Sequence, residues 1–214
     1  PAAPAACGIA VRGFAPAFYH LSKRRKIQME KKLFDFKTKT IVATGLGAAL
    51  FIVLFMYVKI PTGIPETDIK TAYGVGAFFA ALFGPIAGGL IGLIGHGLSD
   101  AIQYGSPWWS WVVASGLTCF ITGLVYPKLK VDEGEFGGKD ILRFNIYQIV
   151  ANVISWVIVA PVLDIVVYAE PVNLVFTQGI VAAISNAVSA GVIGTILLAL
   201  YSKTRSKKGS LTKE

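Results

Sequence analysis

The stretch Phe83–Trp111, FGPIAGGLIGLIGHGLSDAIQYGSPWWSW, decides how the rest of the chain is interpreted. It opens with a helix-breaking Gly-Pro pair and continues as a glycine-rich apolar segment of nearly membrane-spanning length. His96, Asp100 and Gln103 fall on one face of this predicted helix, because residues three and four apart share a side. Ionisable groups in such a segment are costly unless they face protein or water, so they indicate a functional site. The alternative is that His96 and Asp100 satisfy each other at a helix interface.

The composition is typical of a polytopic membrane protein. Of the 214 residues, 54% are hydrophobic and 15% charged, whereas soluble domains carry about 25% charged residues. Basic residues account for a net charge of +8 and cluster before residue 40, between Lys128 and Arg143, and after residue 202. This positive-inside pattern predicts cytoplasmic termini and contact with anionic membrane lipid, and it does not resemble a nucleic-acid-binding module. Lys59 and Lys70 alone lie outside these clusters.

Six apolar segments with short connections predict an all-α integral membrane protein, a six-transmembrane-helix bundle with N and C termini cytoplasmic. The second segment is short for a span. The connection Lys59–Lys70 is too polar to span and too rich in proline to be helical, and as an outer loop it is suited to cover a site. The expected spans are Thr40–Val58, Thr71–Phe83, Ile86–Gln103, Trp108–Tyr126, Phe144–Leu163 and Leu174–Tyr201.

The chain is expected to have three parts. Residues 1–30 mix proline, alanine and a basic run without the apolar core of a signal peptide, so they are interpreted as a disordered tail or a vector-derived segment before a plausible start at Met29. Residues 31–202 form the six-helix membrane domain, and residues 203–214 form a basic cytoplasmic tail.

Polar and aromatic residues gather towards the outer halves of the third, fifth and sixth spans. Aromatic rings beside amides suit a planar heterocycle, because rings stack and amides recognise its donors and acceptors. Tryptophans also form interfacial belts in membrane proteins, so each has an alternative role. Asp164 and Glu170 are expected to be solvated carboxylates at the outer rim. The predicted substrate-binding residues are His96, Asp100, Gln103, Tyr104, Trp108, Asn152, Trp156, Gln178 and Asn186.

Small residues crowd the start of the first span. Ala43 and Gly47, and likewise Gly45 and Ala49, lie four residues apart and share a face, where another helix could approach closely. Such a face serves either packing within the bundle or docking of another membrane subunit.

The GAALF of the first span, the stretch Phe83–Trp111 and the six short helices resemble the S components of energy-coupling factor (ECF) transporters. The resemblance covers about Lys37–Tyr201 and is narrowest to the riboflavin-type subfamily, whose members have also been linked to cobalamin. It implies a subunit of the bacterial plasma membrane that captures a vitamin and associates with a transmembrane T component and two cytoplasmic ATPases. The family's Ala-xxx-Ala docking face for the T component corresponds here to Ala43 and Gly47, or to Gly45 and Ala49.

The resemblance implies vitamin uptake, with cobalamin (vitamin B12) as the leading cargo and riboflavin as the alternative. The chain has no Walker A, metal or dinucleotide motif, so we expect no enzymatic activity, metal or cofactor in it, and ATP and Mg²⁺ would be bound by the partner subunits. A self-contained proton-coupled secondary transporter, with His96 and Asp100 as relay, ranks below this hypothesis. A membrane enzyme with the same pair as acid and base ranks last.

Overall fold

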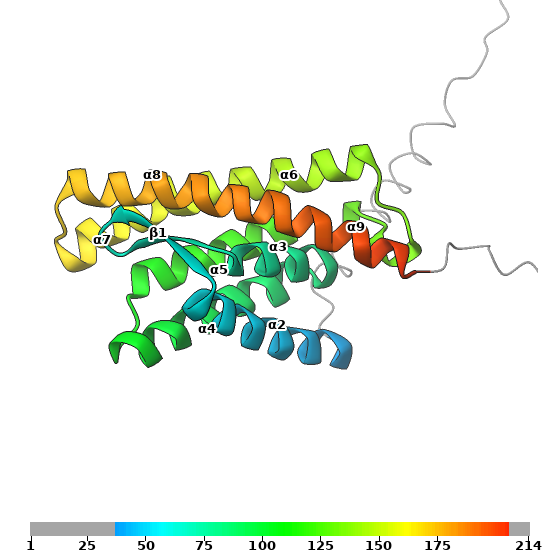
Figure 1. Cartoon of the computed structure of the whole chain (residues 1–214), viewed down its shortest axis with the longest axis horizontal. Helices are drawn as coiled ribbons and strands as arrows, with labels where there is room; N and C mark the ends of the chain where they lie inside the picture. Colours follow the sequence, from blue (N-terminus) through cyan, green and yellow to red (C-terminus); the bar gives the residue numbers. More distant parts are fainter. Residues whose placement is uncertain (1–36, 206–214) are drawn as a thin grey trace, which may run out of the picture. The chain divides into compact units, whose positions relative to one another are not determined.

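Helices make up most of residues 37–205, the part of the chain described by the computed structural model, and this confirms the predicted helical class (Figure 1). Five helical segments are long and apolar enough to cross a membrane. The predictions for residues 1–30 and for residues 206–214 of the basic tail lie outside the described residues. The five segments are Thr38–Tyr57 (α2), Pro85–Tyr104 (α4), Trp109–Lys128 (beginning with α5, Trp109–Gly123), Gly138–Tyr168 and Val172–Lys203.

The remaining predicted span is the short helix α3, Ala72–Phe83, which has 12 residues. At 1.5 Å per residue it is about 18 Å long, well below the roughly 30 Å of a bilayer's hydrocarbon core. The predicted count of six full spans is therefore not confirmed, and the described residues give no orientation for the termini.

The two longest segments each contain a π-helical stretch between two α-helices. In the first, the π-helical stretch ends just before Pro161, which lacks an N–H donor and crowds the preceding turn. The first segment also begins earlier than predicted, at Gly138, so part of the expected loop Lys128–Arg143 is helical. The pieces are α6 (Gly138–Asn152), Val153–Val159 (π) and α7 (Ala160–Tyr168), then α8 (Val172–Ser189), Ala190–Gly194 (π) and α9 (Thr195–Lys203).

The predicted loop Lys59–Lys70 is a β-hairpin, which corrects the all-α expectation. Strand β1 (Lys59–Ile64) pairs antiparallel with β2 (Thr67–Lys70). The sequence analysis excluded a helix here because of the two prolines and did not consider strands. A two-stranded sheet consists only of edge strands, where proline is tolerated. Pro65 and Glu66 form the turn, and Glu66 adopts a positive φ of 55°.

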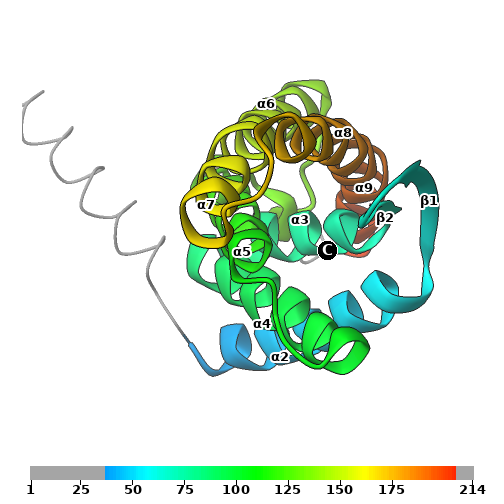
Figure 2. The ribbon, with the colours of Figure 1, turned by 90° about the vertical axis from the view of Figure 1, so that its left-hand side faces the viewer.

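Helix α4, the stretch from which the sequence was interpreted, packs against α2, α3 and α5 (Figure 2). Close approach to α5 depends on glycine: a Cβ on Gly92 would lie 2.5 Å from the backbone oxygen of Ser115. A side of α4 also meets the aromatic core, in which Phe51, Tyr73 and Trp156 are buried. The hairpin lies at the end of the bundle where α4 leads into α5 and α7 leads into α8 (Figures 1 and 2).

We predict that Gly92→Ala lowers the stability of the folded protein by about 1–3 kcal/mol, the usual cost of overpacking. The added methyl group meets the backbone of α5, which cannot yield as a flexible side chain would. The measurement is the thermal unfolding midpoint of the purified protein in detergent.

The matched control is Gly45→Ala, because a Cβ on Gly45 meets no atom within 4 Å among the described residues. This control should be neutral or slightly stabilising, since alanine favours a helix over glycine. Equal midpoints for the two variants would contradict the close packing of α4 on α5.

Candidate binding site

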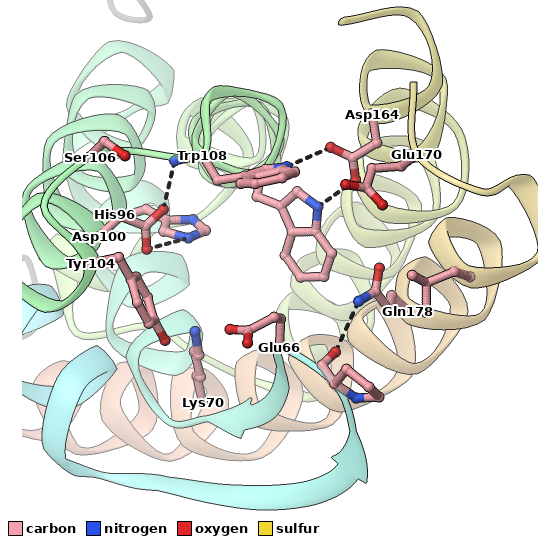
Figure 3. Close-up of a pocket in the computed structure, with 13 residues that line it drawn as sticks. Glu66, Lys70, His96, Asp100, Tyr104, Ser106, Trp108, Asp164, Glu170 and Gln178 are labelled. Carbon is pink, nitrogen blue, oxygen red and sulfur yellow. Dashed lines mark hydrogen bonds and ion pairs between the residues drawn. The ribbon is translucent and has the colours of Figure 1, made fainter. Parts of the chain in front are cut away.

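A cavity of about 460 Å³ lies at the hairpin end of the bundle (Figure 3). Its walls come from the hairpin, the end of α4, the α4–α5 connection, the start of α5, the end of α7 with its connection to α8, and the first half of α8. The lining mixes aromatic rings with carboxylates, an ammonium and an amide. This mixture of apolar walls and a few directed polar groups is typical of a small-molecule site.

Five of the nine predicted substrate-binding residues line this cavity. The structure brings together predicted residues from α4, the α4–α5 connection and α8, which include the expected third and sixth spans but not the predicted residues of the fifth. Whether these side chains contact a ligand stays a prediction. The five are His96, Asp100, Tyr104, Trp108 and Gln178.

The other four predicted residues do not line the cavity. Gln103 donates to the carbonyl of Ser99 at 3.2 Å. Trp156 and Asn152 are buried deeper in the bundle, where Trp156 packs edge-on against Tyr73. The last of the four, Asn186, is buried as well. Helical periodicity predicts the face that a residue occupies but not its depth along the bundle.

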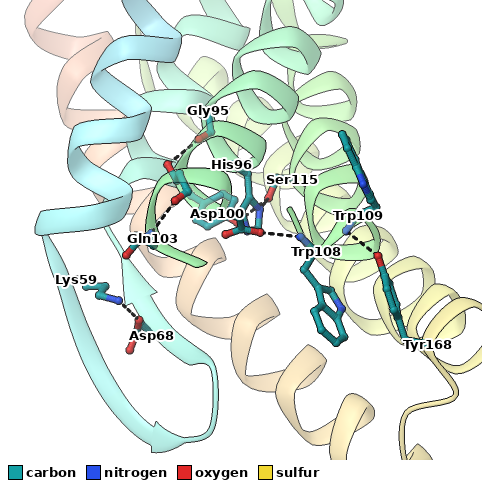
Figure 4. Close-up of polar contacts among 12 residues, drawn as sticks. Lys59, Asp68, Gly95, His96, Asp100, Gln103, Trp108, Trp109, Ser115 and Tyr168 are labelled. Atoms are coloured by element: carbon teal, nitrogen blue, oxygen red, sulfur yellow. Dashed lines mark hydrogen bonds and ion pairs between the residues drawn. The ribbon is translucent and has the colours of Figure 1, made fainter. Parts of the chain in front are cut away.

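His96 and Asp100 interact directly, as the alternative in the sequence analysis had it, with 3.4 Å between Nε2 and Oδ1 (Figure 4). The other carboxylate oxygen of Asp100 accepts the backbone N–H of Trp108 at 3.1 Å and so fixes the start of α5. On its far side, His96 Nδ1 lies 2.6 Å from Ser115 Oγ, which lies 2.8 Å from the hydroxyl of Tyr73. The pair is therefore part of a hydrogen-bonded chain that runs from the cavity wall into the core.

Asp164 is buried, so the prediction of a solvated carboxylate was wrong for this residue. Its Oδ1 accepts the indole N–H of Trp108 at 2.8 Å and the hydroxyl of Ser110, and its Oδ2 accepts the indole N–H of Trp111 at 2.6 Å. The Trp108 ring also stacks on Tyr168 with 4.4 Å between centroids. One carboxylate thus orients two tryptophans of the cavity wall.

The sequence analysis expected this segment to cover a site but named none of its residues as part of the site. Glu66 and Lys70 both line the cavity, and the amide of Gln178 on α8 donates to the carbonyl of Pro65 at 2.9 Å. The expected covering loop is therefore connected to the far wall by a hydrogen bond. A signal was present in the sequence, because Lys70 lies outside the basic clusters that the positive-inside pattern explains.

Comparison with known proteins now defines the family. The family described as ECF-type riboflavin transporter, S component, matches residues 35–203. The chain belongs to this family. The predicted resemblance to ECF S components is therefore confirmed.

Several curated relatives of this S component are UPF0397 proteins. The protein from an Exiguobacterium species is 58% identical over 180 residues, covering 84% of this chain and 98% of the relative. That from Enterococcus faecalis is 51% identical over 176 residues, covering 82% and 96%. That from Streptococcus gordonii is 52% identical over 186 residues, covering 86% and 100%. No solved structure matches this chain significantly.

We predict that Asp164→Asn in this S component lowers stability by about 1–3 kcal/mol, the cost of a buried polar group left without its partner. The amide has only one accepting oxygen, so one indole N–H loses its acceptor and the tryptophan wall loosens. The measurements are the thermal midpoint and the tryptophan emission maximum, which should move to longer wavelength as an indole gains contact with water.

Glu170→Gln serves as the control, because the Glu170 side chain has no hydrogen-bond or ion-pair partner within residues 37–205. It should leave both measurements unchanged. A wild-type emission maximum and midpoint in Asp164→Asn would show that this carboxylate does not hold the aromatic wall.

Proposed function

We propose that this chain is the membrane-embedded substrate-capture subunit of an ATP-driven vitamin uptake transporter of the bacterial plasma membrane. The observation that carries the proposal is the cavity of about 460 Å³ beneath the hairpin, in a member of the S-component family. A site that lies at one end of a membrane bundle and is covered by a connected hairpin suits capture of a solute from one side.

The size of the cavity favours a cargo built on a single heterocycle, such as riboflavin, over cobalamin, the leading candidate from the sequence. At about 460 Å³ it lies in the lower half of the roughly 300–1,000 Å³ range of ligand pockets. The tryptophan wall held by Asp164 offers flat apolar surface for such a ring. A corrinoid is several times larger than a flavin and would have to remain largely outside this cavity.

Membership of the S-component family implies association with a T component and ATPases. The chain has no nucleotide-binding motif, so we assign ATP hydrolysis and Mg²⁺ binding to the partner ATPases. Of the two candidate docking pairs on α2, Ala43 and Gly47 are buried within the bundle, whereas Gly45 and Ala49 are exposed. A Cβ on Gly47 would lie 2.6 Å from Ile91, which supports a packing role for that pair. We therefore place the docking face for the T component at Gly45 and Ala49.

The hydrogen-bonded chain from Asp100 through His96 argues against a self-contained proton relay. It ends, within the described residues, at the Tyr73 hydroxyl, and the Tyr73 ring is enclosed by Phe51, Phe55 and Trp156. A relay would need a continuation to the opposite end of the bundle. This series of hydrogen bonds is better suited to orient the His96–Asp100 pair at the cavity wall.

We predict that calorimetry on the purified chain in detergent detects binding of a flavin, either riboflavin or its 5′-phosphate, and not of cobalamin. Gln178→Ala should weaken that binding about tenfold, which is about 1.4 kcal/mol, because it removes the hydrogen bond between α8 and the hairpin. The control Thr177→Ala changes the neighbouring exposed residue and should bind like wild type. Binding of cobalamin alone would overturn the size argument, and binding of neither a flavin nor cobalamin would contradict the flavin cargo favoured here.

We also predict that Ala49→Leu prevents co-purification of the T component while leaving cargo affinity unchanged. A larger side chain on the exposed face of α2 keeps a second helix from approaching closely. Co-purification from cells that express the T component and both ATPases is the measurement. The control Val188→Leu enlarges an exposed apolar residue on α8 and should assemble normally. Normal assembly of Ala49→Leu would move the docking face elsewhere.

A further inference from the structure

We infer that the cargo carries an anionic group, a carboxylate or a phosphate, which pairs with Lys70 in the cavity. This inference rests on the proposed capture function and adds a chemical class to it. Two observations support it: the position of the Lys70 ammonium in the cavity, and the pairing of Lys59, Asp100 and Asp164 with other groups of the protein.

Lys70 is the last residue of β2, and its side chain extends into the cavity between Tyr104 and Glu66 (Figure 3). Its Nζ lies 3.5 Å from the centroid of the Phe55 ring, an attractive cation–π contact. The ring covers one side of the ammonium and accepts no conventional hydrogen bond from it. Within residues 37–205, Lys70 Nζ has no ion pair and no hydrogen-bond acceptor.

The strand pairing of the hairpin makes a positive charge on Lys70 energetically unfavourable. Lys59 lies directly opposite Lys70 across the two strands, and like charges in opposite positions repel. Lys59 is compensated by Asp68, with 3.0 Å between its Nζ and Oδ2 (Figure 4). Lys70 receives no such partner from the hairpin. A half-buried ammonium without a counter-ion is unfavourable, and a ligand anion would offset that cost.

The carboxylates around the cavity do not supply the missing partner. Asp100 is bonded to His96 and to the N–H of Trp108, and Asp164 is bonded to its three donors. Glu66 is exposed at the turn and Glu170 is partly exposed at the rim, so water screens both charges. Lys70 is therefore the cationic group of the described lining that a ligand anion can neutralise.

Burial lowers the pKa of Lys70 to about 8, although nearby carboxylates oppose the shift. Below pH 8 the side chain is an ammonium, and an anion bound beside it would raise its pKa. Affinity for an anionic cargo should then be constant below pH 8 and fall as the pH rises above it, by up to about tenfold per unit. The charged and titratable groups that face Lys70 are Lys59 on β1, Glu66 in the turn, Asp68 on β2, and His96, Asp100 and Tyr104 on α4.

The experiment is calorimetry on the full chain in detergent with compounds that differ by one anionic group. The pairs are riboflavin and riboflavin 5′-phosphate, nicotinamide and nicotinate, and pantothenol and pantothenate. At pH 7 we expect the anionic member of at least one pair to bind at least tenfold more tightly than its neutral counterpart. A preferred phosphate or a preferred carboxylate then identifies the source of the anion.

Lys70→Met should abolish this preference, whereas the matched control Lys59→Met, which removes the paired lysine of the same hairpin, should retain it. Lys70→Arg keeps a permanent charge, so it should retain the preference and lose the decline above pH 8. The arginine variant distinguishes a lost charge from a misfolded hairpin, because only the former is restored by it.

The outcomes separate this inference from the capture function. Tight binding of neutral members with no preference for the anionic ones, or a preference that survives Lys70→Met, overturns the role of Lys70 and leaves capture intact. Failure of every compound in the panel to bind wild type overturns the vitamin cargo and this inference together.

Discussion

The close approach of α4 to its neighbours is the constraint on which the rest of the structure depends. Gly92 lets the backbone of α4 lie against that of α5, and Gly95 admits the ring of Phe51 from α2. Within a bilayer the hydrophobic effect contributes little to the association of helices, so close packing must stabilise it. The end of α4 then carries His96 and Asp100 to the cavity wall, and Asp100 in turn fixes the first residues of α5.

The polar groups of the site divide into those that build it and those left for a ligand. Asp100 and Asp164 are saturated by protein donors, and their role is to orient His96 and two tryptophans. Gln178 connects α8 to the turn of the hairpin. Lys70 differs from all of these, because its ammonium faces the cavity, contacts the Phe55 ring and has no ion-pair partner within residues 37–205. Preorganised walls around an uncompensated ammonium are what a capture protein needs to bind an anionic solute without rearranging.

Much of the fold could be predicted because membrane helices are specified locally. Apolar length, the Gly-Pro break before α4 and the helical spacing of His96 and Asp100 all follow from positions near one another in the chain. The hairpin was not predicted, because Pro61 and Pro65 exclude a helix but do not by themselves indicate that two short strands pair. The sequence showed that the second predicted span is short, and it was still counted as a span. In the structure it is helix α3, whose 12 residues are too few for a full span.

The sequence by itself determined the helical membrane class, the family and the shared helix face of His96 and Asp100. Only the tertiary structure decided which polar residues share the cavity, that Asp164 is buried beneath the tryptophans, and that Gly45 and Ala49 rather than Ala43 and Gly47 face outward. The physical reason is that composition and periodicity act within one helix. The depth of a side chain in the bundle and its contact partners instead depend on how each helix is rotated, and the π-helical stretches change that rotation. They also depend on the hairpin, which brings Lys70 to the cavity formed with α4 and α8.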